Sequence, residues 1–402
     1  MRATVSIDLI FECLSEEILI DEQLNAVDQL TKNIKGLLKK QQIQHNEIIG
    51  FCTPRRLVLI VHKIITNNSE ESYIKGPSTD ASSISIIGFA KKHNTTPEAL
   101  LTFSIRDKKF YGIARKSLAI THTITNILTN TLQTIKWQKN MHWGTHELKW
   151  ARPIHNIMYV LSNEKAKLTL GHIESNNTTY TGRFIKNSEK KEINSIDEYI
   201  KCMLDNNIIL DQNERVRIFR DKIKEIAAEY HMKISQDLKD ASAVALATEM
   251  PHAMLVEINQ TLVASLPEEI IVSVLETYSF LPMWQEDGSL SSKTITAINI
   301  PPTTIIVDGY RKMLESRLMD AMHIWQQSII QDPKLLYNRL QRISFYESLG
   351  DMAEKTTRIT ALAKYLAIWI PHAQIDQVEK AANIAKLDLT MSITKEFPKL
   401  QG

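Results

Sequence analysis

The sequence predicts an α+β protein with more than one domain. Short apolar runs of strand length occur at residues 5–13, 57–61 and 154–161, and an amphipathic helical pattern separates the first two. From residue 310 onward the pattern is almost entirely helical. Strands mixed with helices, followed by helices alone, are typical of a mixed body joined to a helical segment. A chain of 402 residues is also too long for one compact hydrophobic core.

The opening of the chain is expected to fold as strand, helix, strand. After the first strand, Ser15 is of a residue type that caps helices, and the two glutamates behind it would lie favourably in a first helical turn, so we expect a helix to start here. Apolar residues then recur on one helical face: Leu24, Val27, Leu30, Ile34, Leu37 and Leu38. Residues 50–56 are expected to turn the chain into the strand at 57–61.

Two helices are expected before the third strand. Thr96-Pro97-Glu98 has the residue types of a helix start, with a capping hydroxyl, a proline at the first position and an acid in the first turn. A second helix is expected at residues 121–137, because its apolar residues share one face: Ile124, Ile127, Leu128, Leu132 and Ile135.

The stretch that enters the third strand has two open interpretations. Trp143-Gly144 predicts a turn, and Pro153 stiffens the backbone beside Arg152. Trp143, Trp150 and Arg152 could therefore form a recognition surface on an ordered corner. Alternatively, the tryptophans fill a core and Arg152 extends along it to solvent.

The second half of the chain adds helices and one hairpin. A helix is expected at residues 213–231, and its basic residues form either a solvated face or a contact with nucleic acid: Arg215, Arg217, Arg220, Lys222 and Lys224. Leu266-Pro267-Glu268-Glu269 predicts a helix start, and Asp287-Gly288 predicts a turn between two strands. Asp332-Pro333 predicts another helix start, and the last apolar helical face is marked by Leu362, Leu366 and Trp369. We expect a boundary near residue 330, which divides a mixed body (1–330) from a helical segment (331–402).

Composition excludes several classes of protein. The net charge of +2 argues against indiscriminate coating of nucleic acid, so any such contact must come from local basic clusters. Cys13, Cys52 and Cys202 show no metal-ligand spacing, and a reduced, cytoplasmic protein is expected. No apolar run reaches the ~18 residues that span a bilayer, so no membrane contact is expected. Asp8 interrupts the first apolar stretch, which argues against a signal peptide.

The sequence shows no self-contained active site. It has neither type of glycine-rich phosphate loop, no zinc-type cysteine and histidine spacing, and no Gly-x-Ser-x-Gly elbow. His142 and His146 are four residues apart, but Gly144 places a predicted turn between them. We therefore expect no catalytic residue and no metal site in this chain.

Several motifs, in the right order, resemble the beta subunit of bacterial tetrameric glycine–tRNA ligase. The matching stretches include Glu12-Cys13-Leu14-Ser15-Glu16-Glu17-Ile18, Thr53-Pro54-Arg55-Arg56-Leu57-Val58-Leu59, Lys75-Gly76-Pro77, Gly88-Phe89-Ala90, Met141-His142-Trp143-Gly144, Arg152-Pro153-Ile154-His155, Glu249-Met250-Pro251, Leu266-Pro267-Glu268-Glu269 and Leu349-Gly350 with Lys355 and Arg358. The sequence departs from the family pattern at Leu19, Thr181-Gly182, Thr277-Tyr278 and Glu315.

The resemblance implies a division of labour between two chains. In this family the separate alpha subunit carries the site where glycine and ATP react, and the beta subunit binds tRNA and completes an assembly of two alpha and two beta chains. The chain is therefore expected to bind no cofactor itself, with ATP and Mg at the alpha subunit, and to have the alpha subunit and the tRNA for glycine as partners. Arginines suit contact with the phosphate backbone. The candidates, each of which could instead form a structural ion pair, are Arg55, Arg56, Arg152, Arg183 and Arg317.

The family's beta subunit is considerably longer than this chain. The resemblance places the rest of a helical HD-like region, which would begin in 331–402, and a C-terminal anticodon-binding domain beyond Gly402, so we expect a shortened chain. No His-Asp dipeptide occurs in residues 332–402, which argues against a metal in the HD-like segment. Two alternatives stay open: a scaffold that binds the alpha subunit without supporting aminoacylation, and a hydrolase or editing-type domain.

Overall fold

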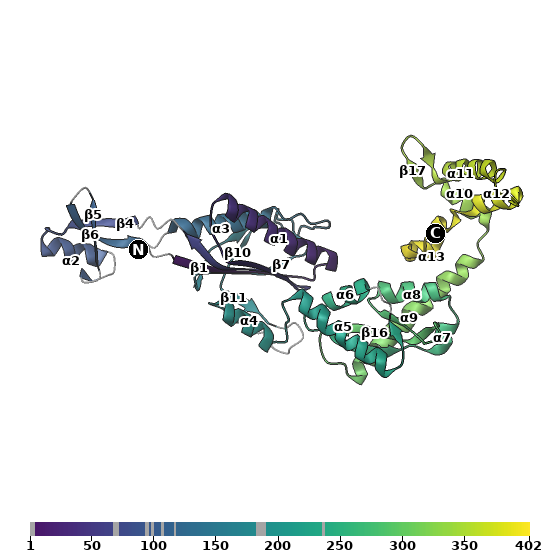
Figure 1. Cartoon of the computed structure of the whole chain (residues 1–402), viewed down its shortest axis with the longest axis horizontal. Helices are drawn as coiled ribbons and strands as arrows, with labels where there is room; N and C mark the ends of the chain where they lie inside the picture. Colours follow the sequence, from purple (N-terminus) through teal and green to yellow (C-terminus); the bar gives the residue numbers. More distant parts are fainter. Residues whose placement is uncertain are drawn as a thin grey trace. The chain divides into compact units, whose positions relative to one another are not determined.

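The computed structural model describes residues 5–66, 72–92, 96–97, 100–105, 108–115, 118–181, 190–234 and 238–402 (Figure 1). The chain divides into two compact units, Met1–Gln212 and Asn213–Gly402. Helices are mixed with antiparallel sheets, which confirms the predicted α+β class. The boundary predicted near residue 330 falls inside the second unit and stays a prediction.

The first unit is built on a five-stranded sheet with the order β2-β3-β1-β7-β8, in which all neighbouring strands are antiparallel. Its strands are β1 (Val5–Ser15), β2 (Glu47–Cys52), β3 (Arg56–Thr66), β7 (Ile154–Leu161) and β8 (Glu164–Lys165). The register pairs Leu14 with Arg56 and Ser15 with Ile154. The end of β1 therefore lies between the starts of β3 and β7.

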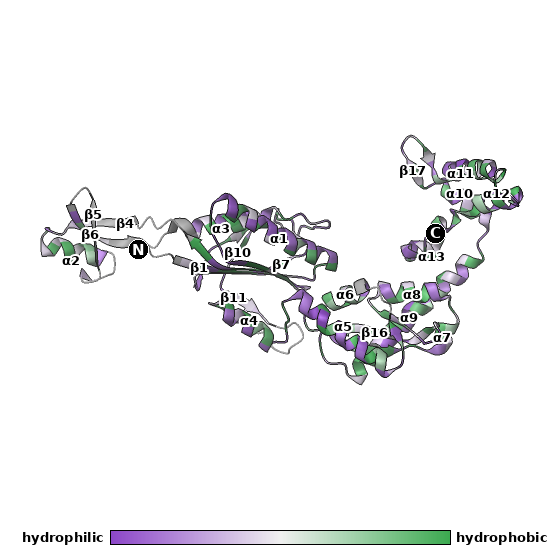
Figure 2. Ribbon diagram, in the orientation of Figure 1, coloured by the Kyte–Doolittle hydropathy of each residue, from purple (hydrophilic) through white to green (hydrophobic). Residues whose placement is uncertain are grey.

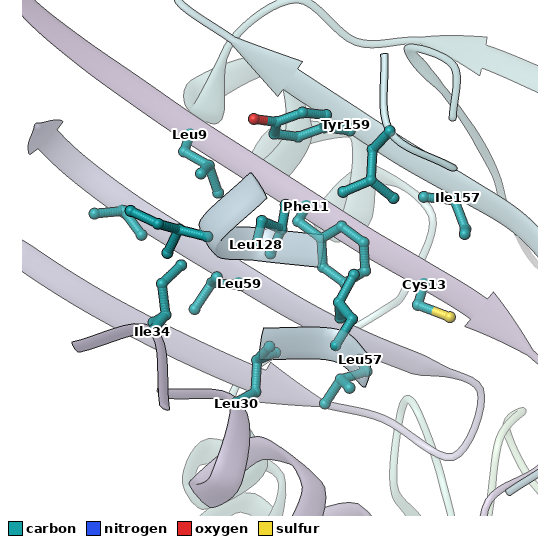
Figure 3. Packing of buried hydrophobic residues seen from close by; sticks show 14 of the residues in the cluster. Leu9, Phe11, Cys13, Leu30, Ile34, Leu57, Leu59, Leu128, Ile157 and Tyr159 are labelled. Atoms are coloured by element: carbon teal, nitrogen blue, oxygen red, sulfur yellow. The ribbon is translucent and has the colours of Figure 1, made fainter. Parts of the chain in front are cut away.

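Both faces of this sheet are covered by helices (Figure 1). Helices α1 (Ile20–Lys40) and α3 (Leu118–Gln133) pack on the face that carries Phe11 and Leu59, as Figure 3 shows. Helix α4 (Ile196–Asp205) packs on the other face. Because side chains alternate between two buried faces, the central strands are mainly apolar along their length, as the green colour of β7 in Figure 2 shows.

Two expectations about the opening of the chain are wrong. Ser15 does not cap a helix, because it still belongs to β1; the helix begins at Ile20 after Leu19, which makes no side-chain cap. Residues 50–56 are not all turn either, because Gly50 lies within β2 and only the residues between β2 and β3 reverse the chain. The glycine is needed there, since a Cβ atom would lie 2.5 Å from Cγ2 of Thr31.

The rest of the first unit consists of small sheets and one helix. Strands β4 (Ser72–Ser78), β6 (Lys108–Arg115) and β5 (Leu101–Ile105) form a three-stranded antiparallel sheet, and helix α2 is Ser83–Lys92. Two short pairs are β9 (Thr169–Leu170) with β10 (Ile173–Glu174), and β11 (Thr178–Tyr180) with β12 (Lys190–Glu192). Of the helix expected from Thr96, residues 98 and 99 lie outside the described part, and a strand follows at β5 instead.

The second unit contains a four-stranded antiparallel sheet with the order β13-β15-β16-β14. Its strands are β13 (Lys233–Ile234), β14 (His252–Glu257), β15 (Leu281–Trp284) and β16 (Leu290–Ile298), and its helices are α5 (Gln212–Glu229), α6 (Leu238–Leu246), α7 (Gln260–Ala264), α8 (Glu268–Thr277) and α9 (Thr304–Ile329). Helices α5 and α6 cover one face of the sheet, and α8 and α9 cover the other. The turn predicted at Asp287-Gly288 is confirmed, with φ +88° at Gly288.

The chain ends in a group of short helices. They are α10 (Pro333–Leu340), α11 (Met352–Ala367), α12 (Ile375–Ile384) and α13 (Ser392–Glu396), with a small hairpin of β17 (Ser344–Tyr346) and β18 (Gly350–Asp351), and 3₁₀ turns at Leu387–Thr390 and Pro398–Leu400. Asp332 caps α10 and Asp351 caps α11, the first as predicted. None of the helices in the described part of the chain combines the length and apolar character that crossing a lipid bilayer demands.

Candidate nucleic-acid interface

Three motifs from distant parts of the sequence meet at one end of the five-stranded sheet. They are residues 15–18 at and after the end of β1, residues 53–56 before and at the start of β3, and residues 151–155 before and at the start of β7. We call this group of residues the motif corner. The antiparallel register brings them together, because the end of β1 lies between the starts of its two neighbours.

Backbone hydrogen bonds fix the motif corner. The Ser15 N–H donates to the Arg55 carbonyl oxygen (2.8 Å), and the Ile18 N–H donates to that of Pro54 (2.7 Å). The Glu16 N–H donates to the carbonyl oxygen of Pro153 (3.0 Å). Residues 15–18 thus tie two arginine-bearing turns to each other. Side chains mounted on such a backbone are positioned before any ligand arrives.

Arg55 and Arg152 are the half-buried cations of the motif corner. The Arg55 Nε donates to the Ser15 carbonyl oxygen (3.3 Å), and the Arg152 Nη1 donates to that of Ala151 (3.0 Å). Within the described residues, Arg152 forms no ion pair with a carboxylate. Next to them, His155 Nε2 and Glu16 Oε1 are 2.8 Å apart at partly exposed positions. The corner can therefore offer the Arg152 guanidinium to an anionic ligand.

Arg56 is placed differently, because its side chain is only 1% exposed. Its Nε donates to Oε2 of the fully buried Glu12 (3.2 Å), and its Nη2 donates to the Tyr180 carbonyl oxygen. The Glu12 carboxylate also accepts from the hydroxyls of Thr179 and Tyr199, both at 2.6 Å. Of the two interpretations of Arg56, this geometry favours the structural ion pair. Glu12 was not singled out as its partner, although an acid inside an apolar strand is a signal for one.

The other two arginine candidates lie elsewhere. Arg183 falls outside the described residues. Arg317 is on α9 in the second unit, where its Nη1 is 3.2 Å from Oδ2 of Asp320 and its guanidinium lies 5.6 Å from the centre of the Tyr278 ring. Its side chain is 48% exposed, so this pairing is a surface contact.

The tryptophans of the motif stretch divide between core and surface. Trp150 is 2% exposed and packs edge-on against Trp137, with ring centres 4.9 Å apart, as the core interpretation predicts. Trp143 is half-buried and lies against His172, which stacks on His146 at a ring-centre distance of 3.4 Å. Desolvation by its neighbours, and next the charge of His146, lower the pKa of His172. The described residues contain no group of three metal-ligating side chains.

Basic side chains of helix α5 form ion pairs at the surface. Arg217 lies 2.6 Å from a carboxylate oxygen of Glu214 and 3.3 Å from one of Asp221, and the hydrogen bond from Arg217 lowers the pKa of Glu214. Lys222 lies 2.7 Å from Glu225. Arg215, in contrast, is fully buried. These contacts favour the solvated-face interpretation over contact with nucleic acid.

Comparison with known proteins identifies the family. A family model described as glycyl-tRNA synthetase beta subunit matches residues 9–402. The chain therefore belongs to a family of aminoacyl-tRNA synthetase subunits, which are ligases: the glycyl-tRNA synthetase beta-subunit family. The resemblance predicted from the motifs is confirmed.

Individual relatives are similar over almost the whole chain. The glycine–tRNA ligase beta subunits of Rickettsia prowazekii and Rickettsia typhi are each 32% identical over 403 residues, and that of Rickettsia felis is 28% identical over 402 residues. Each match covers 98% of this chain, but only 59% or 60% of the relative. The chain thus spans about three fifths of the length of the curated relatives it matches.

Proposed function

We propose that this chain acts in glycine–tRNA ligase as the beta-type subunit, which binds tRNA and assembles with the alpha subunit. The alpha subunit would use ATP, with Mg, to attach glycine to its tRNA. The observation that carries the proposal is the family match across residues 9–402. It also agrees with a sequence that has no glycine-rich phosphate loop and no nucleophile elbow.

The motif corner supports the tRNA part of the proposal. Arg55 and Arg152 lie on turns that are tied together by backbone hydrogen bonds, so little order has to be imposed when a phosphate binds. A planar guanidinium can pair with a phosphate through two parallel hydrogen bonds. Because the net charge is only +2, attraction to RNA has to come from such local groups. We assign Arg56 a supporting role, since it is buried against Glu12.

A cytoplasmic location is part of the same proposal. All three cysteines, Cys13, Cys52 and Cys202, are free thiols. Free thiols suit a reducing compartment, where disulfides are rare. Protein synthesis, which would consume the glycyl-tRNA, takes place in that compartment as well.

A scaffold is the second candidate, and the partial coverage of the relatives favours it. A chain that spans 59% of a relative can keep the contact with the alpha subunit while lacking parts that aminoacylation needs. The two candidates therefore predict the same complex with the alpha subunit but different effects on glycylation.

One experiment separates them. Purified alpha subunit of the same organism is mixed with tRNA for glycine, ATP and Mg, and the rate of glycyl-tRNA formation is measured with and without this chain. A tenfold or larger stimulation, weakened in the Arg152→Ala variant, supports the ligase subunit. Stable co-purification with the alpha subunit without stimulation supports the scaffold. If the two chains neither associate nor cooperate, both candidates are wrong.

A further inference from the structure

Helices α11 and α12 carry large apolar side chains on their outer surfaces. Figure 2 shows hydrophobic (green) and hydrophilic (purple) residues mixed on both helices. The exposed fractions of these apolar side chains lie between 42% and 73%. The residues are Leu362, Tyr365 and Leu366 on α11, Ile368, Trp369 and Ile370 directly after it, and Ile375 and Ile384 at the two ends of α12. Single exposed apolar residues are ordinary, but a concentration on one pair of helices marks a contact surface.

Four of these side chains lie in one row along α11 and the turn that follows it. Leu362, Tyr365 and Leu366 are on α11, spaced by three or four residues or adjacent, which keeps them on one side of the helix. Trp369 lies in the turn just after the C-cap Ile368, and its N–H donates to the Leu366 carbonyl oxygen, so it continues this side. Contact between the Tyr365 and Trp369 rings, whose centres are 6.5 Å apart, agrees with this placement. We call these four residues the α11 face.

The opposite side of α11 is already buried. It carries Met352, Thr356, Thr360 and Ala367, of which Thr356 is completely buried. A helix that covers a core on one side normally presents polar residues on the other. Helix α11 instead has apolar residues on both sides, a pattern that is typical of a helix surrounded by protein.

The contact between α11 and α12 does not bury the large apolar side chains of these helices. The buried apolar residues that the two helices contribute here are small, Ala367 and Ala382. Around them, Lys364 and Glu379 form an ion pair (2.8 Å), and the Thr360 hydroxyl lies 3.2 Å from Oδ1 of Asn383. The two helices thus meet through small side chains and polar contacts, while their largest apolar side chains stay exposed.

We propose that the α11 face binds the polypeptide that completes the family's beta subunit, the part of that subunit which this sequence does not contain. The family match includes α11 and α12, so the face belongs to a fold that the longer relatives share. About two fifths of each relative lies outside the match. That additional chain is present whenever a full-length subunit is made, and it is available to cover a shared apolar surface.

The chemistry of the face fits a permanent protein contact better than RNA. The four residues carry no charge, and the basic side chains of α11 are engaged elsewhere. Lys364 pairs with Glu379, Lys355 lies 3.8 Å from the centre of the Phe345 ring, and the Arg358 Nη2 donates to the Leu349 carbonyl oxygen. Interfaces between chains that stay together are more apolar than transient ones. The expected occupant therefore presents an apolar helical or loop surface of its own.

A binding experiment tests the proposal without tRNA, glycine or ATP, so it is independent of the proposed function. The probe is the part of the Rickettsia prowazekii relative that lies outside the 403-residue match, produced as a separate polypeptide. Light scattering and titration calorimetry are expected to show a one-to-one complex with the unaltered chain. Leu366→Glu and the milder Trp369→Gln are each expected to weaken the complex at least tenfold. Ile305→Glu, at an 83% exposed position on α9, is the matched control and should bind like the unaltered chain.

Other results would overturn the proposal. Circular dichroism and urea midpoints first establish that the variants fold, as expected for exposed positions. No complex with the probe, or equal affinity in all variants, rejects the α11 face as its binding site. A homodimer that Leu366→Glu dissociates would assign the face to a second copy of this chain. A tenfold loss of alpha-subunit affinity in the same variant would assign it to that partner.

Discussion

The Glu12 carboxylate and the Arg56 guanidinium are in contact inside the first unit, with Oε2 and Nε 3.2 Å apart and side chains 0% and 1% exposed. The contact joins β1 to β3, and the further hydrogen bonds of Glu12 reach β11 and α4. A recognisable family motif therefore contains one arginine that holds the fold together and, next to it, Arg55 at the motif corner.

Breaking this pair on one side should be costly. In Glu12→Leu or Arg56→Met the remaining charge stays buried without its partner, and we expect the free energy of unfolding to fall by about 3–5 kcal/mol. The double variant should recover a large part of the loss, because no charge is left uncompensated. Urea denaturation measures all three. Lys32→Met, which breaks the exposed pair with Asp28, is the control and should cost less than about 1 kcal/mol. The prediction is contradicted if Glu12→Leu or Arg56→Met lowers the free energy of unfolding no more than Lys32→Met does.

Removing the arginines of the motif corner should weaken RNA binding without unfolding the protein. For Arg152→Ala and Arg55→Ala we expect about tenfold weaker binding of the tRNA for glycine, and a salt dependence of log Kd smaller by about one phosphate contact each. Fluorescence anisotropy across a range of salt concentrations measures both quantities. Arg217→Ala is the matched control, since its guanidinium is engaged by Glu214 and Asp221. The assignment fails if this control loses affinity while Arg152→Ala does not.

Two glycines of the first unit should respond in opposite directions to alanine. In Gly50→Ala the new methyl group would meet Cγ2 atoms of Thr31 and Val27 at 2.5 and 2.6 Å, so we expect a loss of about 1–3 kcal/mol from overpacking. In Gly36→Ala nothing lies within 4 Å, and the position is inside α1, so a gain of about 0.5–1 kcal/mol is expected. Thermal and urea unfolding compare the pair. Equal effects would mean that α1 is not packed on β2 as described.

Acid should loosen the stack of His146 on His172. The pKa of His172 is lowered from its ordinary value of 6.5, so the unfolded chain binds more protons below that pH and the folded state loses stability as pH falls. We expect faster hydrogen exchange in residues 141–150 at pH 5 than pH 7.5, after correction for the intrinsic rate. His172→Gln should flatten this dependence, whereas His323→Gln, in the second unit, should leave it unchanged. An identical pH dependence in His172→Gln would show that another group is responsible.

Elements with a strong local pattern were predictable from the sequence. Strand β7 is found at the predicted residues 154–161, because both of its faces are buried and Ser162 and Asn163 follow with positive φ. The apolar face predicted for α3 is buried as well. Ser15 was misassigned because its partner in the sheet, Ile154, is far away in the sequence. Local capping chemistry cannot compete with a long-range strand pairing that the sequence does not display.

The candidate site was predictable in its residue types but not in its geometry. The motifs around Arg55 and Arg152 are visible in the sequence, whereas their meeting at one end of the sheet depends on the register of three strands. Arg56 is the first residue of β3 and is buried, whereas Arg55 precedes the strand and is half-buried. Two adjacent positions at a strand entrance cannot be ranked in this way by sequence alone. The apolar face predicted from Leu362, Leu366 and Trp369 is present, but its exposure could only be seen in the structure.

After the short helices the chain packs again on α9, and this affects where the protein tolerates insertions and deletions. Ile393 and Phe397 are buried in the same cluster as Leu314 and Leu318 of α9, so the segment at 333–390 is anchored at both of its ends. Insertions or deletions within residues 333–390 leave the packing at both ends of this segment in place. Length variation should therefore be concentrated in this segment. Trimming residues 392–400 would instead open a void beneath α9, which makes these few residues poor sites for a protease cut or an affinity tag.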